Sequence, residues 1–72
     1  MTTEEKLALL EETFEADEGT IKADMKLRDV EEWDSMSKLS LIVMMEDEFG
    51  KKLSGNDVRK LESVQDILEL MQ

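Results

Sequence analysis

The sequence predicts an all-α fold, a bundle of three longer helices and one short helix with a long loop between the first helix and the second. Apolar residues recur at helical spacing along most of the chain, and a capping residue can be placed before each helical stretch. No segment shows the alternation that is typical of a strand. The 72 residues suffice for one small core, so residues 1–72 are expected to form a single domain.

The first helix is expected to begin at Thr2, because Thr2 and Glu5 have the spacing of a capping box. Leu7, Leu10 and Phe14 then lie at i, i+3 and i+7, which places them on one apolar face. Gly19 marks the expected end of the helix soon afterwards.

Residues 17–34 lack helical rhythm and are expected to form a long ordered loop. Isolated apolar residues should attach this loop to the core: Ile21, Met25, Leu27 and Val30. A connection of this length is unusual in so short a chain, and such loops are often functional.

The second helix is the clearest element, since Asp34 can cap it, apolar residues continue from Met36 to Phe49, and Gly50 can end it. The residues at i, i+4 and i+8 are expected to face the core: Leu41, Met45 and Phe49. Other apolar residues lie around the same helix, and some of them should flank the core or contact a partner: Leu39, Ile42, Val43 and Met44.

Two further helices are expected near the end of the sequence. The cluster at residues 54–57 (SGND) begins a short helix that holds Val58 and Leu61. Ser63, with Asp66 three residues later, opens a last helix with four apolar residues: Val64, Ile67, Leu68 and Met71.

The composition excludes several classes of function. Nineteen acidic residues against nine basic ones give a net charge of −10, which argues against nucleic-acid binding. Cysteine and histidine are absent, so disulfides and thiolate chemistry are excluded, the commonest general base and metal ligand is missing, and no metal site is expected. No apolar run is long enough to span a membrane, and the acidic start does not resemble a signal peptide. The expected location is therefore the cytoplasm.

The residues with the most specific chemistry are Asp34 and Ser35, where the long loop meets the longest helix. The free N–H groups and the dipole of a helix start favour a phosphate attached to such a serine. The simpler alternative is that both residues only cap the helix, and an isolated Asp-Ser pair does not decide between the two.

The wider sequence resembles the acyl carrier protein family over nearly its whole length. Residues 27–36 (LRDVEEWDSM) are similar to the loop that leads into the family's Asp-Ser-Leu attachment motif, with Met36 in place of leucine. Residues 39–42 (LSLI) and 45–50 (MEDEFG) are similar to the family's helix, which ends in an acidic run and an aromatic residue. Residues 53–67 match its short helix and closing helix in order and spacing.

This resemblance implies an acyl-carrier-like four-helix bundle that is not an enzyme. Ser35 would accept 4′-phosphopantetheine from coenzyme A through a separate phosphopantetheinyl transferase that uses Mg²⁺, and Asp34 would support that reaction. The arm would then carry acyl groups as thioesters to ligases or synthases of fatty-acid or specialised, polyketide-like biosynthesis. We expect the carrier itself to be a monomer.

The resemblance also implies that the second helix binds basic surfaces on partner enzymes. The expected docking residues combine acidic side chains with an apolar strip: Asp34, Met36, Leu39, Val43, Glu46, Asp47 and Glu48. Such contacts depend on electrostatic steering. For the acidic run taken alone, a solvated helix face is the alternative.

Other interpretations remain beside the acyl carrier. Ser37, Lys38 and Ser40 replace residues that are more acidic in fatty-acid carriers, and Trp33 is more typical of specialised pathways. An aminoacyl or peptidyl carrier, of the D-alanyl or nonribosomal-peptide type, and an unmodified interaction module of the same fold stay open. Ser35 and Lys38 also spell the Ser-x-x-Lys motif of penicillin-recognising enzymes, but its companion motifs are missing. The acidic run lacks the ligand spacing of a calcium loop.

Overall fold

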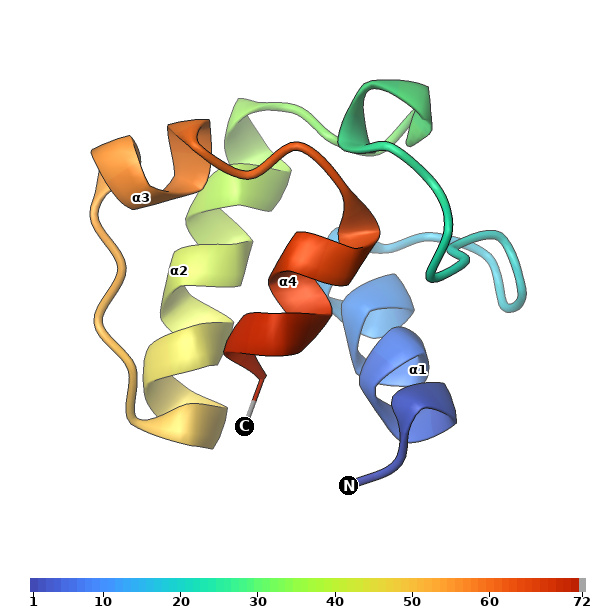
Figure 1. Cartoon of the computed structure of the whole chain (residues 1–72), viewed down its shortest axis with the longest axis horizontal. Coiled ribbons are helices and arrows are strands. Elements are labelled where there is room, and N and C mark those ends of the chain that lie inside the picture. Colours follow the sequence, from blue (N-terminus) through green and yellow to red (C-terminus); the bar gives the residue numbers. More distant parts are fainter. Residues whose placement is uncertain (72) are drawn as a thin grey trace.

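The computed structural model describes residues 1–71, and it confirms the predicted all-α fold. Four α-helices and one short 3₁₀ segment follow one another along the chain: α1 (Thr3–Phe14), η1 (Leu27–Asp29), α2 (Ser35–Phe49), α3 (Gly55–Arg59) and α4 (Val64–Leu70). Figure 1 shows α4 between α1 and α2 in this view, with α3 near the N-terminal half of α2. Both α2 and α4 pack against α1.

One apolar cluster holds the helices and the long loop together. Its members are at most 8% exposed and come from all the longer elements: Leu10, Phe14, Ile21, Leu27, Val30, Leu41, Met44, Met45, Val64, Ile67, Leu68 and Met71. The periodic apolar positions of each helix therefore meet at one centre, as the sequence pattern predicted.

The first helix begins as predicted and ends earlier than Gly19 indicated. Thr2 and Glu5 form the complete capping box. The helix ends at Phe14 because Glu15 adopts the left-handed conformation, with φ 56°, and its N–H bonds back to Glu11 and Glu12 carbonyls. Gly19, with φ 83°, instead belongs to a turn in the following loop.

The long loop is attached to two parts of the bundle. Ile21, Leu27 and Val30 are buried and Met25 is partly buried, which confirms the predicted attachment to the core. Backbone hydrogen bonds also join the loop to the α3–α4 junction: Leu27 N–H donates to the Glu62 carbonyl at 3.0 Å, and Val64 N–H donates to the Met25 carbonyl at 3.0 Å. The loop is thus an ordered part of the fold.

Helix α2 has the predicted caps, Asp34 and Gly50, and its buried face includes the expected stripe and extends beyond it. Leu41 and Met45 are fully buried, whereas Phe49 in the last turn is only partly buried. Met44, one of the further apolar residues of this helix, is 8% exposed. The contact with α1 accounts for its burial, because it covers the side of α2 that carries Met44.

The two closing helices begin at the predicted residues. Ser54 with Asp57, and Ser63 with Asp66, form complete capping boxes at the starts of α3 and α4. Val58 is buried, and so are the four predicted apolar residues of the last helix: Val64, Ile67, Leu68 and Met71. Leu61 follows α3 and packs partly buried against the core.

Candidate functional site

Ser35 is the first residue of α2 and is exposed to solvent. The long loop ends at Asp34, which caps the helix, and the helix begins at the next residue. The first N–H groups of an α-helix have no partner inside the helix, and the helix dipole adds positive potential there. The Ser35 hydroxyl therefore lies at a place that suits an attached phosphate group.

Asp34 holds the start of this helix through its side chain. Asp34 Oδ1 accepts a hydrogen bond from Ser37 N–H at 2.9 Å. The hydrogen bonds from Ser37, first its backbone N–H and then its hydroxyl, lower the pKa of the Asp34 carboxyl group below its ordinary value. Asp34 is consequently ionised at neutral pH, and its stabilisation of the helix start is present there and is lost only as the pH falls through the lowered pKa.

Ser37 has a structural role that the sequence reasoning did not find. Its side chain is buried, with Oγ hydrogen-bonded to the Glu32 carbonyl oxygen and lying 3.1 Å from Asp34 Oδ1. It thus fastens the end of the loop to the first turn of α2. Its position three residues after a capping aspartate is the signal that could have identified it, because a cap accepts from that residue.

The environment of Ser35 differs from that of the other four serines in the chain. Ser37 is buried, and Ser40 is half-buried. Ser54 and Ser63 accept hydrogen bonds from Asp57 and Asp66 N–H groups as helix caps. Within residues 1–71, Ser35 is the exposed serine whose hydroxyl caps no helix.

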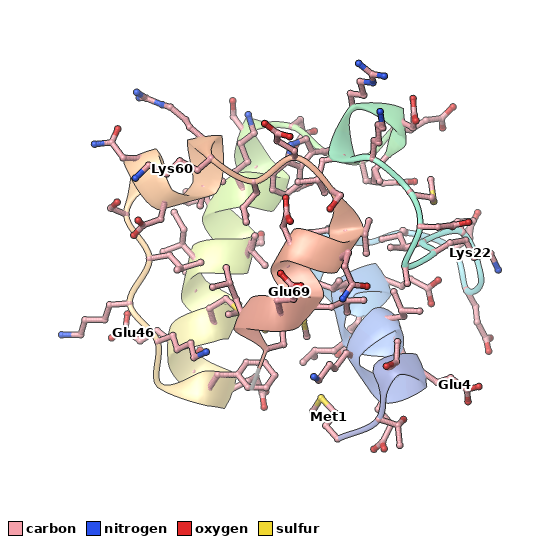
Figure 2. The ribbon with its side chains drawn as sticks, in the orientation of Figure 1. Met1, Glu4, Lys22, Glu46, Lys60 and Glu69 are labelled. Atoms are coloured by element: carbon pink, nitrogen blue, oxygen red, sulfur yellow. The ribbon has the colours of Figure 1, made fainter. Side chains whose placement is uncertain are left out.

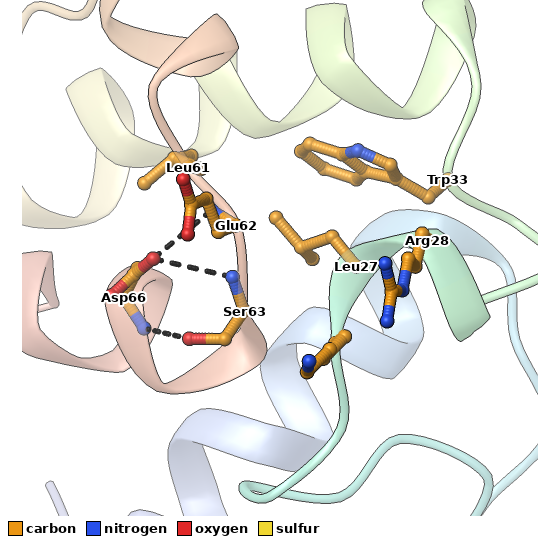
Figure 3. A pocket seen from close by; sticks show the side chains of 8 residues that line it. Leu27, Arg28, Trp33, Leu61, Glu62, Ser63 and Asp66 are labelled. Carbon is orange, nitrogen blue, oxygen red and sulfur yellow. Dashed lines mark hydrogen bonds between the residues drawn. The ribbon is translucent and has the colours of Figure 1, made fainter.

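Trp33, two residues before Ser35, connects the site to the core and to a groove. Its ring packs edge-on against Phe14, with centroids 5.6 Å apart, and Lys38 Nζ lies 5.7 Å from a Trp33 ring centroid. The ring also faces a groove of about 600 Å³ between the loop and the α3–α4 junction (Figure 3). Eight residues line this groove: Lys26, Leu27, Arg28, Trp33, Leu61, Glu62, Ser63 and Asp66.

One wall of the groove is fixed by hydrogen bonds, drawn as dashed lines in Figure 3. Asp66 Oδ2 accepts from Glu62 N–H at 3.0 Å and from Ser63 N–H at 3.2 Å, while Asp66 N–H donates to Ser63 Oγ at 3.2 Å. Leu27 and Leu61 supply apolar surface beside the Trp33 ring. The groove therefore offers an aromatic and aliphatic surface with charged edges, close in sequence to Ser35.

The predicted docking residues all lie on α2 or at its cap, and all of them are exposed. Met36, Leu39 and Val43 are 73, 59 and 54% exposed, and their i, i+3 and i+7 spacing puts them on one face. Glu46, Asp47 and Glu48 are in the last turns of the helix, where Figure 2 shows Glu46. Eleven residues at 1.5 Å each separate Glu46 from Ser35 by roughly 17 Å along the axis. The acidic run is thus too far away to act on the Ser35 hydroxyl directly.

Within residues 1–71, no group of three or more acidic, histidine or cysteine side chains is placed to hold a metal ion. Over the same range, none of the helices has the length and apolar character needed to cross a membrane.

The comparison with protein families gives one match. The family model described as "phosphopantetheine attachment site" matches residues 7–71. A search of the curated proteins gave no match. The matched segment includes every helix from the middle of α1 onward, together with Asp34 and Ser35.

Proposed function

This chain belongs to the phosphopantetheine attachment site family, and from that membership we propose that it is an acyl carrier protein whose prosthetic arm is attached at Ser35. Domains of this family are carriers that hold 4′-phosphopantetheine covalently and catalyse no reaction themselves. Their function requires a phosphopantetheinyl transferase and partner enzymes that load and unload the arm. The proposal concerns the attachment residue, the cargo and the docking surface.

The observation that carries the proposal for Ser35 is its exposed hydroxyl at the first residue of α2. An attached phosphodiester would lie beside the N–H groups of the helix start, where negative charge is stabilised. The capping geometry of the other serines and the burial of Ser37 leave them less suited to react. The residues present thus fit the prosthetic group.

In the attachment reaction, Ser35 Oγ would form a bond to the phosphorus that carries the pantetheine chain of coenzyme A. The pyrophosphate bond to the adenosine bisphosphate group would break, that group would leave, and the hydroxyl proton would pass to a base of the transferase. The lowered pKa of Asp34 and its place beside Ser35 support the proposal that it helps to orient the Mg²⁺ ion of the transferase. When attached, the arm supplies the thiol that a chain without cysteine lacks.

The cargo that we propose is an acyl group of fatty-acid or specialised biosynthesis, with an aminoacyl or peptidyl group as the alternative. The support is the resemblance of residues 27–67 to acyl carriers described above. We further propose that residues 1–72 form one monomeric carrier domain of the cytoplasm. Docking of basic partner surfaces would use Asp34 and the exposed side chains of α2: Met36, Leu39, Val43, Glu46, Asp47 and Glu48.

The test of the attachment residue is intact-mass measurement. The apo-protein is incubated with coenzyme A, Mg²⁺ and a broad-specificity transferase, and we expect a mass gain of one phosphopantetheinyl group. The Ser35→Ala variant should keep the helical circular-dichroism spectrum of the parent and gain no mass, because its hydroxyl is exposed and caps no helix.

The matched control is Ser40→Ala, a change of the same size on the same helix. This variant should be modified like the parent. Modification of Ser35→Ala, or loss of modification in Ser40→Ala, would contradict the assignment. If the parent protein gained no mass, the alternative of an unmodified interaction module with the same fold would describe this protein better. Competition between acyl and aminoacyl ligases for the modified protein then identifies the cargo class.

A further inference from the structure

Lys38 is the basic residue nearest to Ser35 in the sequence, and the proposed function gives it no role. It follows Ser35 by three residues, and it replaces a residue that is more acidic in the fatty-acid carriers that this chain resembles. The chain has nine basic residues against nineteen acidic ones. A cation one turn from the attachment residue therefore needs a physical explanation.

The side chain of Lys38 lies along the first turn of α2. Its Nζ is 5.7 Å from a ring centroid of Trp33, which precedes the first residue of the helix by two positions. Long side chains on a helix lean toward its N-terminus, so the lysine stem runs from its own Cα back past the level of Ser35 to reach this ring. The ammonium group and the Ser35 hydroxyl therefore lie at the same end of the helix.

Lys38 and Ser35 also share one side of the helix. At about 100° per residue, three residues leave them about 60° apart around the axis, and side chains at this spacing have Cβ atoms about 5–6 Å apart. Ser35 is exposed and Lys38 is half-buried, so the lysine lies between the serine and the buried face that holds Leu41 and Met45. A phosphate on Ser35 Oγ is thus within reach of the flexible lysine stem.

The surroundings of Lys38 hold its ammonium group and leave its charge available. The Trp33 ring packs edge-on against Phe14, with centroids 5.6 Å apart, so it is fixed to the core and offers the cation an aromatic surface. Asp34 is the acidic residue nearest to Lys38 in the sequence, but its Oδ1 accepts a hydrogen bond from Ser37 N–H at 2.9 Å. This carboxylate is thus engaged at the helix start, which leaves the charge of Lys38 to an anion on Ser35.

We propose that Lys38 binds the phosphodiester of the prosthetic arm on Ser35 and fixes the base of the arm on the side of α2 that faces Trp33. The phosphodiester adds one negative charge to a chain of net charge −10, and an ammonium group one turn away offsets that charge. Lys38 is a positioning residue, since it forms no covalent bond to the arm. This inference rests on the proposed carrier function, because the phosphate is present only after loading.

The alternative is a structural role, in which Lys38 does no more than cover the Trp33 ring. A lysine in that role would make the same contact before and after loading, so its removal would change the stability of the two forms by the same amount. A lysine that binds the phosphate stabilises the loaded form specifically. The difference between the apo and loaded forms therefore separates the two roles.

The first measurement uses the isotope-labelled parent protein before and after complete loading. We expect the Cε and Hε signals of Lys38 to shift on loading more than those of Lys52, an exposed lysine between α2 and α3. The ³¹P signal of the loaded protein should be broad, because a bound phosphate tumbles with the whole bundle. Lys38 signals that do not move on loading would overturn the proposal.

The second measurement compares the thermal melts of Lys38→Met and Lys52→Met, two variants with the same net charge. Loading should lower the Tm of Lys38→Met by about 2–4 °C relative to its effect on the parent, since the new charge is no longer offset. Lys52→Met should match the parent, and so should Lys38→Arg, which keeps a cation at this position. Equal effects of loading on the two methionine variants would overturn the proposal in favour of net charge alone.

Intact mass separates this inference from the proposed function. It is measured on every preparation, so only fully loaded protein enters the comparison. A parent that gains no mass at Ser35 would refute the carrier function and the role of Lys38 with it. A parent that gains mass, with no Lys38 shift and no specific loss of Tm in Lys38→Met, would refute the role of Lys38 and keep the carrier.

Discussion

At the scale of single residues, Glu11 shows how a charged side chain can serve the core of so acidic a chain. It is 7% exposed, and its Oε2 accepts hydrogen bonds from Gly19 N–H at 2.8 Å and from Ile21 N–H at 3.1 Å. Glu11 thereby satisfies two backbone donors of the loop just before Ile21 enters the core. A buried carboxylate with two such donors positions the first half of the loop.

Replacement of Glu11 by alanine should therefore destabilise the protein more than the same change at its exposed neighbour Glu12. We expect Glu11→Ala to lower the free energy of unfolding by about 2–4 kcal/mol, because it leaves two donors without a partner. Glu11→Gln keeps an acceptor oxygen and should cost less. Glu12→Ala should stay within about 0.5 kcal/mol of the parent. Urea titrations followed by circular dichroism measure all three, and equal midpoints for the first and last variants would disprove the role of Glu11.

At the scale of elements, the helix ends differ in how well their residues fit the backbone. Gly50 ends α2 with a positive φ of 66°, a conformation that glycine adopts without strain. Glu15 ends α1 in the same left-handed region although it has a side chain. Its negative charge also lies at the negative end of the helix dipole. Glu15 therefore destabilises the C-terminus of α1 in two ways, through its backbone conformation and through its charge.

Glycine at this position should consequently stabilise the protein. We expect Glu15→Gly to raise the free energy of unfolding by about 0.5–1 kcal/mol, since relief of the left-handed strain exceeds the added entropy of the unfolded chain. The control Glu12→Gly, inside the same helix, should lower it by about 1 kcal/mol. Thermal melts of both variants give the comparison. A destabilised Glu15→Gly variant would mean that the Glu15 side chain stabilises the fold in another way.

At the scale of the whole molecule, the dominant feature is the excess of negative charge. A net charge of −10 is carried by a body only 27 × 25 × 19 Å in extent. Like charges at such separations repel one another and oppose the compact state. The proposed docking to basic partner surfaces would use the same charge, because opposite charges attract over a distance.

Screening of this repulsion should make the protein more stable in salt. Raising NaCl from 0.1 M to 1 M should increase the free energy of unfolding by about 1 kcal/mol, which for a chain of this size raises Tm by about 4–8 °C. A variant in which Glu46, Asp47 and Glu48 are changed to their amides should show a smaller increase. Calorimetry at several salt concentrations measures both. A Tm that does not change with salt would show that the charges are too far apart to repel.

The features that the sequence predicted are those encoded locally. The four helix starts and the exposed Ser35 depend on residues within a few positions of each other, and the structure places them as expected. The degree of burial along α2 was not predictable, because this helix is apolar on several sides and spacing alone does not fix which side meets α1: Met44 is buried there, and Phe49 is only partly buried. Glu11 could not be identified, since its partners lie across a tertiary contact.

A groove between α1 and α2, lined by residues of both helices, likewise could not be predicted from the sequence. Glu12 and Asp47 are 35 positions apart, and only the packing of the two helices brings them to one surface. The hydrogen bonds between the loop and the α3–α4 junction join backbone atoms, which every residue type has. The sequence therefore could not indicate them. The positions of Asp34 and Ser35 at the start of α2 were predictable from the sequence, and the surfaces around them required the fold.

The fluorescence of Trp33 can report on what occupies the groove beside it. It is the one tryptophan of the chain, and its half-buried ring lies between Phe14 and the open groove, two residues before Ser35. Indole fluorescence depends on the polarity around the ring. Any arm or cargo that settles in that groove would therefore exclude water from the ring, shift its emission to shorter wavelength and protect it from a dissolved quencher. Each change of cargo could then be followed in real time in the unlabelled, wild-type protein.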